Sequence, residues 1–312
     1  MSLRQKARFF TICCVLLGNA TLHKNSKADN FNVYLVFMKN ELDNKSEKYG
    51  LPHNRWQVFG DRIKTHFGKF LLCGLILLIF ALPLFAVRMY ADMSVATLYD
   101  KYKQELLTAD EYSGAVATVT LVASALNVVG FLVFAVGLSG VVRQVRQMAW
   151  SEPVEFWKDF AVGVKQNVGR YLIVFFVLGV LNAFDSVVMQ TNSDVWSYIP
   201  LCLYVFVVFP PALHMLVQVA IYNHKFGDIF ATSAFLYVKT LPISILFSVL
   251  FMSHGLLDMV SVFAVRYVCK MVFVLALPIA VLAWFLYVCS ALDKYVNKQS
   301  YPQLVDKGVW RL

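Results

Sequence analysis

Residues 70–90 read FLLCGLILLIFALPLFAVRMY, and the only charged side chain in this run is Arg88, near its end. A bilayer core about 30 Å thick is crossed by roughly 20 apolar residues in an α-helix, because each residue adds about 1.5 Å. The run is therefore long enough to span a membrane. A surface helix of a soluble protein carries a polar face, which this run lacks, so the sequence argues against a soluble fold.

Five further runs share this length and this apolar character. With the first run they predict six transmembrane helices, at about 70–90, 114–141, 171–190, 197–222, 238–263 and 271–292. Hydrophobic residues make up 59% of the chain, well above the share typical of soluble domains. We therefore expect an all-α fold, a polytopic membrane helical bundle at 56–295, between an N-terminal segment 1–55 and a tail 296–312.

The net charge of +9 is unevenly placed along the chain. Basic residues at one set of helix ends are Arg55, Arg62, Lys64, Lys69, Arg143, Arg146, Lys158, Lys165, Arg170, Lys225, Lys239, Lys294 and Lys298. The opposite ends have only Arg88, Lys101, Lys103, Arg266 and Lys270. Because Lys and Arg are enriched on the cytoplasmic side, we expect a multi-pass protein of the cell membrane with both termini cytoplasmic. The expected partner of this charge is the lipid bilayer, not a nucleic acid.

The first 37 residues allow three interpretations. Arg4, Lys6 and Arg8 precede the apolar run 9–20, which is the pattern of a weak signal peptide. Cleavage after that run would invert every loop, against the charge asymmetry. Alternatively, the natural start is Met38, or the run is a short interfacial helix, since 12 apolar residues are too few to span.

Three polar connections carry patterns of their own. Residues 56–69 predict an amphipathic helix that leads into the first span, and residues 227–242 predict another before the fifth. The connection 142–170 predicts a helix over 150–168, N-capped by Ser151, that lies on the inner membrane face and turns at Gly169 into the third span. The acidic segment 91–113 is expected as an outer loop. Cytoplasmic amphipathic helices are thus part of the predicted fold.

The stretch GVVRQVRQMAWSEPVEFWKDFAVGVKQNVGRYLIVFF, residues 140–176, resembles the signature of the YesL-like bacterial membrane proteins. Its matching positions are Gly140, Arg143, Arg146, Asp159, Phe160, Lys165, Gln166 and Asn167. The segments 59–85 and 229–247 are similar to the family's opening span and its later amphipathic helix. The extension 1–37 and the long loop after the first span depart from the family pattern.

This resemblance implies a function of a general kind. Genes of YesL-like proteins often accompany carbohydrate-uptake genes in Gram-positive bacteria, which implies a supporting or transport role. A permease or another membrane subunit would be the partner. The family is largely uncharacterised, so the resemblance implies no catalytic residue.

Ionisable and polar residues inside the predicted spans are the candidate site. Asp185, His254 and Asp258 lie in the outer half, and His254 and Asp258 share one helical face at i and i+4. They could line a polar cavity, or they could simply reach the outer interface. Deeper in the bilayer lie Asn127, Asn182 and His214. His214 follows Pro210-Pro211, which must kink the fourth span and free backbone carbonyls.

Three classes of function remain open. The first is a non-catalytic membrane component that supports carbohydrate uptake. The second is a small secondary transporter or channel with a polar site in the outer half of the bundle, and the third is an intramembrane enzyme. No nucleotide motif, no catalytic set, no metal-ligand spacing and no cofactor motif is recognised, so we expect no enzyme. A separation of more than about 12 Å between Asp185 and His254 would exclude a shared site, and we expect them to be separate.

Overall fold

A computed structural model describes residues 52–191 and 195–309, which form one compact unit. The described residues are all-α, and six helical segments are long and apolar enough to cross a membrane. The helices are α3 (Arg55–Lys103), α4 (Ala109–Ala149), α5 (Phe156–Thr191), α6 (Ile199–Leu203), α7 (Phe209–Ile221), α8 (Phe226–Lys239), α9 (Leu241–Met252), α10 (Phe263–Leu292) and α11 (Lys298–Ser300). The predicted helical bundle is confirmed. The interpretations of residues 1–37 lie outside the described part.

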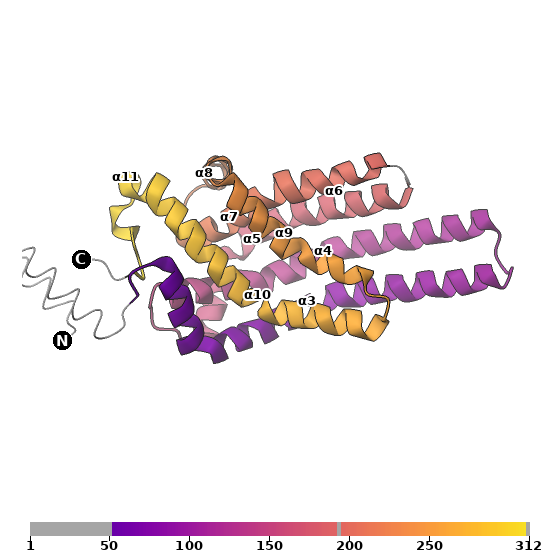
Figure 1. The fold of residues 1–312 in the computed structure, drawn as a ribbon, viewed down its shortest axis with the longest axis horizontal. Coiled ribbons are helices and arrows are strands. Elements are labelled where there is room, and N and C mark those ends of the chain that lie inside the picture. The colour runs from indigo at the N-terminus through magenta and orange to yellow at the C-terminus, as the bar shows by residue number, and fades with distance from the viewer. Residues whose placement is uncertain (1–51, 192–194, 310–312) are drawn as a thin grey trace, which may run out of the picture. The chain divides into compact units, whose positions relative to one another are not determined.

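The predicted lead-in helix forms the first part of α3. Asn54 caps it, since its side-chain oxygen accepts a 2.8 Å hydrogen bond from the backbone N–H of Gln57. The backbone leaves helical geometry at His66, with φ −124° and ψ 20°, and the apolar span continues from there. Figure 1 shows the resulting change of direction in the indigo part of the ribbon.

The segment 91–113 is helical, so the prediction of a loop there is wrong. α3 continues to Lys103 and α4 begins at Ala109, which leaves a short turn. Thr108 and Glu111 form a capping box at the start of α4, and Tyr102 stacks on Tyr112 across the turn. Acidic residues made this segment look like a loop, but Asp100, Asp110 and Glu111 are exposed on the helices, and Asp92 is ion-paired with Arg266. Figure 1 shows the α3–α4 hairpin extending beyond the ends of the neighbouring helices.

α4 and α5 form the largest helix pair, and glycines allow their close approach. A Cβ at Gly140 would lie 2.4 Å from the Phe160 ring, and one at Gly163 would lie 3.1 Å from the Cα of Gly140. α5 runs without a break from Phe156, so the prediction of a separate inner-face helix over 150–168 is wrong. Ser151 has φ 59° in the turn before α5 and does not cap the helix.

The second half of the bundle is more broken than the first. α8 is a separate helix, as predicted, and it meets α9 at Thr240, where φ is −122° and ψ is 21°. Figure 1 shows α8 almost end-on while α9 runs along the bundle. α9 ends at Met252 and a 3-10 turn follows to Met259, so the fifth span is shorter than the predicted 238–263.

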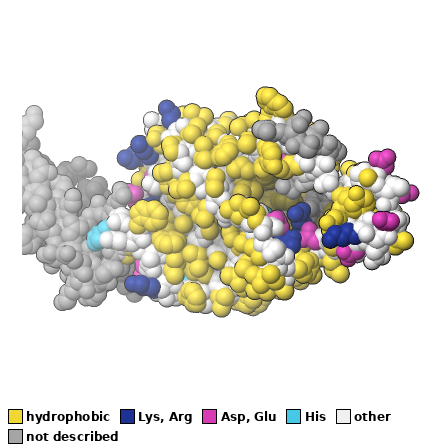
Figure 2. All heavy atoms as spheres, turned by 45° about the vertical axis from the view of Figure 1, so that its right-hand side comes forward, with side chains coloured by type: hydrophobic (Ala, Val, Ile, Leu, Met, Phe, Trp, Pro, Cys, Tyr) yellow, Lys and Arg dark blue, Asp and Glu magenta, His cyan; other side chains and the backbone are white. Residues whose placement is uncertain are grey.

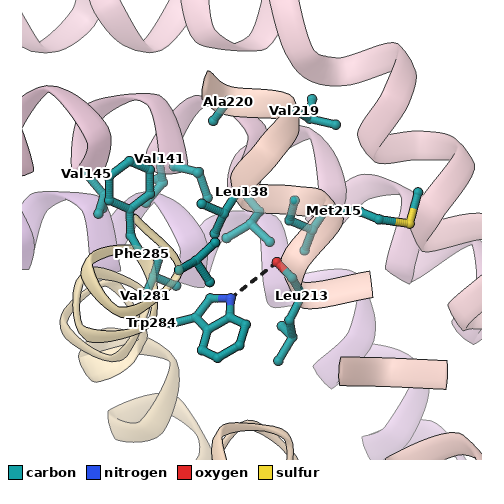
Figure 3. Close-up of a cluster of buried hydrophobic side chains, with 14 of the residues drawn as sticks. Leu138, Val141, Val145, Leu213, Met215, Val219, Ala220, Val281, Trp284 and Phe285 are labelled. Atoms are coloured by element: carbon teal, nitrogen blue, oxygen red, sulfur yellow. Dashed lines mark hydrogen bonds between the residues drawn. The ribbon is translucent and has the colours of Figure 1, made fainter. Parts of the chain in front are cut away.

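The core lies where α4, α7 and α10 meet (Figure 3). Buried apolar side chains there are Leu138, Val141 and Val145 from α4, Leu213, Met215, Val219 and Ala220 from α7, and Val281, Trp284 and Phe285 from α10. The Trp284 Nε1–H donates a 3.2 Å hydrogen bond to the carbonyl of Leu213, which leaves no unpaired polar atom on the indole. Outside this core the helices expose many large apolar side chains, as Figure 2 shows, which suits a surface in contact with lipid.

Candidate functional site

The fourth span is interrupted before Pro210-Pro211, as the sequence predicted. A π-helical turn, Tyr204–Val208, separates α6 from α7. The N–H of Phe209 bonds to the carbonyl of Tyr204, five residues earlier instead of four. Such a turn is a common response when a proline removes a donor from the hydrogen-bond ladder.

Two hydroxyl groups donate hydrogen bonds to the backbone carbonyls that this interruption leaves without a helical partner. In the π register the carbonyl of Val205 faces Pro210, which has no N–H, and Ser248 of α9 donates to it instead. The carbonyl of Phe206 also lacks its normal partner, and the Tyr237 hydroxyl of α8 donates to it. The broken helix is thus held by α8 and α9, because a carbonyl without a partner is costly inside a bilayer.

His214 lies fully buried in α7, beside the break between α8 and α9. Its Nε2 is 2.9 Å from the Ser244 hydroxyl and 3.4 Å from the Thr240 hydroxyl, and these hydroxyls are 2.9 Å apart. The ring packs edge-on against Trp284, with centroids 4.7 Å apart. The Nδ1 atom is buried and has no hydrogen-bond partner among the described residues. His214 therefore joins α7 to α9 and α10.

Other polar groups along α7 are bonded in the same way. Gln218 donates to the Ser233 hydroxyl of α8 at 2.7 Å, and the buried Tyr171 hydroxyl of α5 donates to the carbonyl of Leu216 at 2.8 Å. The carbonyl of Ala220, in the last turn of α7, accepts a 2.7 Å hydrogen bond from Arg146. A cation at this position also complements the helix dipole.

A charged cluster joins α3, the 3-10 turn after α9 and the start of α10; we name it the Arg88 network. Its members are Arg88, Asp92, Asp258, Arg266, Tyr267 and Lys270. Figure 2 shows basic and acidic side chains close together in a hollow of the otherwise hydrophobic surface. Three cations face two carboxylates, so the cluster has a positive balance.

The contacts inside the Arg88 network are of unequal length. Asp258 accepts a 2.5 Å bond from Lys270, whose side chain is almost wholly buried, and Asp92 accepts a 2.9 Å bond from Arg266. Arg88 lies 3.6 Å from Asp92 and 3.8 Å from Asp258, and nearly half of its side chain is exposed. Arg88 is therefore the member with the most capacity left for another partner.

The structure brings two of the predicted outer residues into one neighbourhood. His254 and Asp258 both interact electrostatically with Lys270 and Arg88. The His254 Nδ1 also lies 3.1 Å from the carbonyl of Phe251. The prediction that this pair shares one α-helical face is wrong, because both residues lie in the 3-10 turn Ser253–Met259, which has three residues per turn. The basic members were not predicted to join it, because they lie on other helices and were interpreted as topology signals.

Asp185 belongs to a different part of the bundle. It is buried on α5, its charge acts on Tyr204 in the π-helical turn, and its Oδ1 has no hydrogen-bond partner among the described residues. Asn182 lies one turn earlier on α5, where its backbone carbonyl accepts from Ser186 at 2.9 Å. Asn127 is half-buried on α4. No hydrogen bond or ion pair joins these residues to His254 or His214 within the described part of the chain.

The residues that carry the family resemblance lie at the α4–α5 crossing. Gly140 meets Phe160, and Arg143 donates to the Gln166 side chain. Asp159 accepts a 2.7 Å bond from the backbone N–H of Glu155 at the start of α5. The three remaining positions are Arg146, bonded to α7, Asn167, buried, and Lys165, exposed. Their observed contacts are those of a helix-packing motif.

A second polar cluster was not predicted from the sequence; we name it the Asp293 network. Asp293, only 7% exposed, accepts from Arg55 at 2.6 Å, from Asn297 at 2.8 Å and from the backbone N–H of Asp306 at 3.2 Å. The Tyr222 hydroxyl donates to Asn297. The cluster joins α3, α7 and the chain after α10. The only sign of this cluster in the sequence was Asp293 itself, a single carboxylate that directly follows an apolar run and precedes Lys294.

The described residues contain no group of three or more His, Cys, Asp or Glu side chains that could hold a metal ion. The hydrogen bonds and ion pairs of the two networks and of His214 join separate helices to one another. Comparisons with protein-family models, with curated proteins and with solved structures find no match to this chain.

Proposed function

We propose that this chain is a non-catalytic membrane component, a helical subunit that supports the work of another membrane protein. The observation that carries the proposal is the bonding of the polar groups on α7 and in the π-helical turn before it. His214, Gln218 and the carbonyls freed by Pro210-Pro211 bond to side chains of α8 and α9. A transport path needs polar groups that remain available to a solute, whereas these groups are used to join helices. The His214 Nδ1, which has no partner among the described residues, is buried.

The partner that we propose is a carbohydrate permease or another membrane subunit of a carbohydrate-uptake system. The resemblance of residues 140–176 to YesL-like proteins of Gram-positive bacteria supports this choice. The large exposed apolar surface, which includes Tyr90, Met93 and Leu121 on the projecting α3–α4 hairpin, gives such a subunit room to contact both lipid and a protein partner.

Uptake measurements in vesicles and in cells test the proposal together. The purified chain, reconstituted alone, should take up radiolabelled mono- and disaccharides no faster than protein-free vesicles. Deletion of its gene in the native host should lower the uptake of at least one carbohydrate several-fold, and a plasmid copy should restore it. Unchanged uptake of every sugar tested in the deletion strain would contradict the proposal.

A small secondary transporter or channel is the second candidate, and the Arg88 network favours it. Arg88 is half exposed, its two ion-pair contacts are long, and His254 lies beside it. Uptake by the reconstituted chain alone that is lost in Asp258→Asn, but kept in the exposed control Asp110→Asn, would establish this candidate and exclude the first.

A further inference from the structure

A shallow groove lies between α8 and the chain that follows α10, next to the π-helical turn Asp293–Asn297 that carries part of the Asp293 network. Its volume is about 330 Å³. The lining residues are Ala231, Thr232 and Phe235 from α8, and Tyr295, Val296, Gln299 and Ser300 from the opposite wall. The lining therefore combines the aromatic rings of Phe235 and Tyr295 with the hydroxyls of Thr232 and Ser300 and the amide of Gln299. The function proposed above makes no use of it.

Two lysines flank this groove. The Phe235 and Tyr295 rings stand edge-to-face, with centroids 6.3 Å apart. The Lys239 Nζ lies 5.7 Å from the centroid of Phe235, and the Lys294 Nζ lies 5.0 Å from the centroid of Tyr295. Each ammonium group is thus held over a ring that lines the groove, one on each wall.

These lysines have no acidic partner in the described part of the chain. The ion pairs there involve neither Lys239 nor Lys294, nor Lys298 one turn further on. All three lysines are exposed. Lysines that form no ion pair with the described residues, beside a groove lined by hydroxyl and amide groups, are complementary to an anion.

We propose that this groove binds the headgroup of an anionic phospholipid. The phosphate lies between Lys239 and Lys294, and the headgroup hydroxyls face Thr232, Gln299 and Ser300. The lipid, not a soluble phosphate, is the occupant, because exposed apolar side chains continue from the basic wall. Val238 and Leu241, 67% and 41% exposed, flank Lys239 and provide a surface for acyl chains. The groove is lined by the middle of α8, and Lys239 beside it is one residue before Thr240, where α8 meets α9.

Native mass spectrometry of the purified chain with equimolar phosphatidylglycerol and phosphatidylcholine tests the proposal. The wild-type chain should retain one phosphatidylglycerol in preference to phosphatidylcholine. The double variant Lys239→Gln/Lys294→Gln should lose this preference by about thirtyfold, since a lysine near an anionic headgroup contributes about 1 kcal/mol. Lys239→Arg/Lys294→Arg should keep the preference, because it preserves both charges.

Two controls separate a built site from general charge attraction and from a soluble ligand. Lys158→Gln/Lys165→Gln removes the same number of lysines from α5 and should leave retention unchanged. Glycerol 3-phosphate in tenfold excess should not displace the lipid. Equal retention of the two lipids by the wild type, equal losses in the two glutamine variants, or displacement by glycerol 3-phosphate would each overturn the proposal.

Discussion

Single residues decide how the broken fourth span is stabilised. Pro210-Pro211 predicted the kink, because proline lacks an N–H and clashes with the preceding turn. The partners of the freed carbonyls, Ser248 and Tyr237, could not be predicted, since one hydroxyl in an apolar helix looks like any other until the helices are packed. The same holds for His214, whose depth was evident from the sequence and whose bond to Ser244 was not.

Ser244→Ala should destabilise the chain through the loss of the His214 contact. A polar bond between membrane helices contributes about 0.6 kcal/mol on average and at most about 1.7 kcal/mol. We expect the apparent melting temperature in detergent to fall by about 2 °C. Ser253→Ala is the matched control, because the Ser253 hydroxyl bonds only within its own turn, to the carbonyl of Leu250. Equal melting temperatures for the two variants would show that the His214 contact contributes nothing.

At the scale of elements, glycines bring α4 and α5 close together at the Gly140–Gly163 crossing, and aromatic side chains such as Phe134 and Phe175 pack between the two helices further along. Membrane helices gain no hydrophobic driving force from each other, so close backbone approach has to supply the contact. Gly163 stands against the Arg143 side chain at 2.9 Å and the Gly140 backbone at 3.1 Å, measured from an added Cβ. The sequence singled out Gly140 only through the family resemblance, and it gave no sign of Gly163.

Gly163→Ala should therefore weaken the α4–α5 pair. The added methyl group has no space unless the helices separate, which typically costs about 1–3 kcal/mol. Gly169→Ala, on the same helix, meets no atom within 4 Å and should be neutral or slightly stabilising, because alanine favours the helix by up to about 1 kcal/mol. Thermal unfolding of both variants in the same detergent makes the comparison. A Gly163→Ala variant as stable as Gly169→Ala would contradict the packing described for this crossing.

At the scale of the whole molecule, hydropathy alone predicted the number and order of the apolar helices. A 20-residue apolar run has few alternatives to a membrane helix, which explains this success. Two predictions failed because polar residues were interpreted as the end of a span. Over 91–113 a loop was predicted where α3 and α4 continue, and over 150–168 a separate helix was predicted where α5 runs straight into the third span. The Asp293 network was missed because its members are far apart in the sequence, from Arg55 to Asp306.

Cysteine labelling of intact cells tests the central claim, a bundle that crosses the membrane between the α3–α4 tip and the start of α5. In a background without native cysteines, single cysteines replace Asp100, Lys158 and Lys298, which are all exposed. The Lys/Arg asymmetry predicts that a membrane-impermeant maleimide labels position 100 in intact cells, and positions 158 and 298 only after permeabilisation. Labelling of positions 100 and 158 from the same side would contradict a membrane crossing by α4, and labelling of 158 but not 100 in intact cells would invert the whole arrangement.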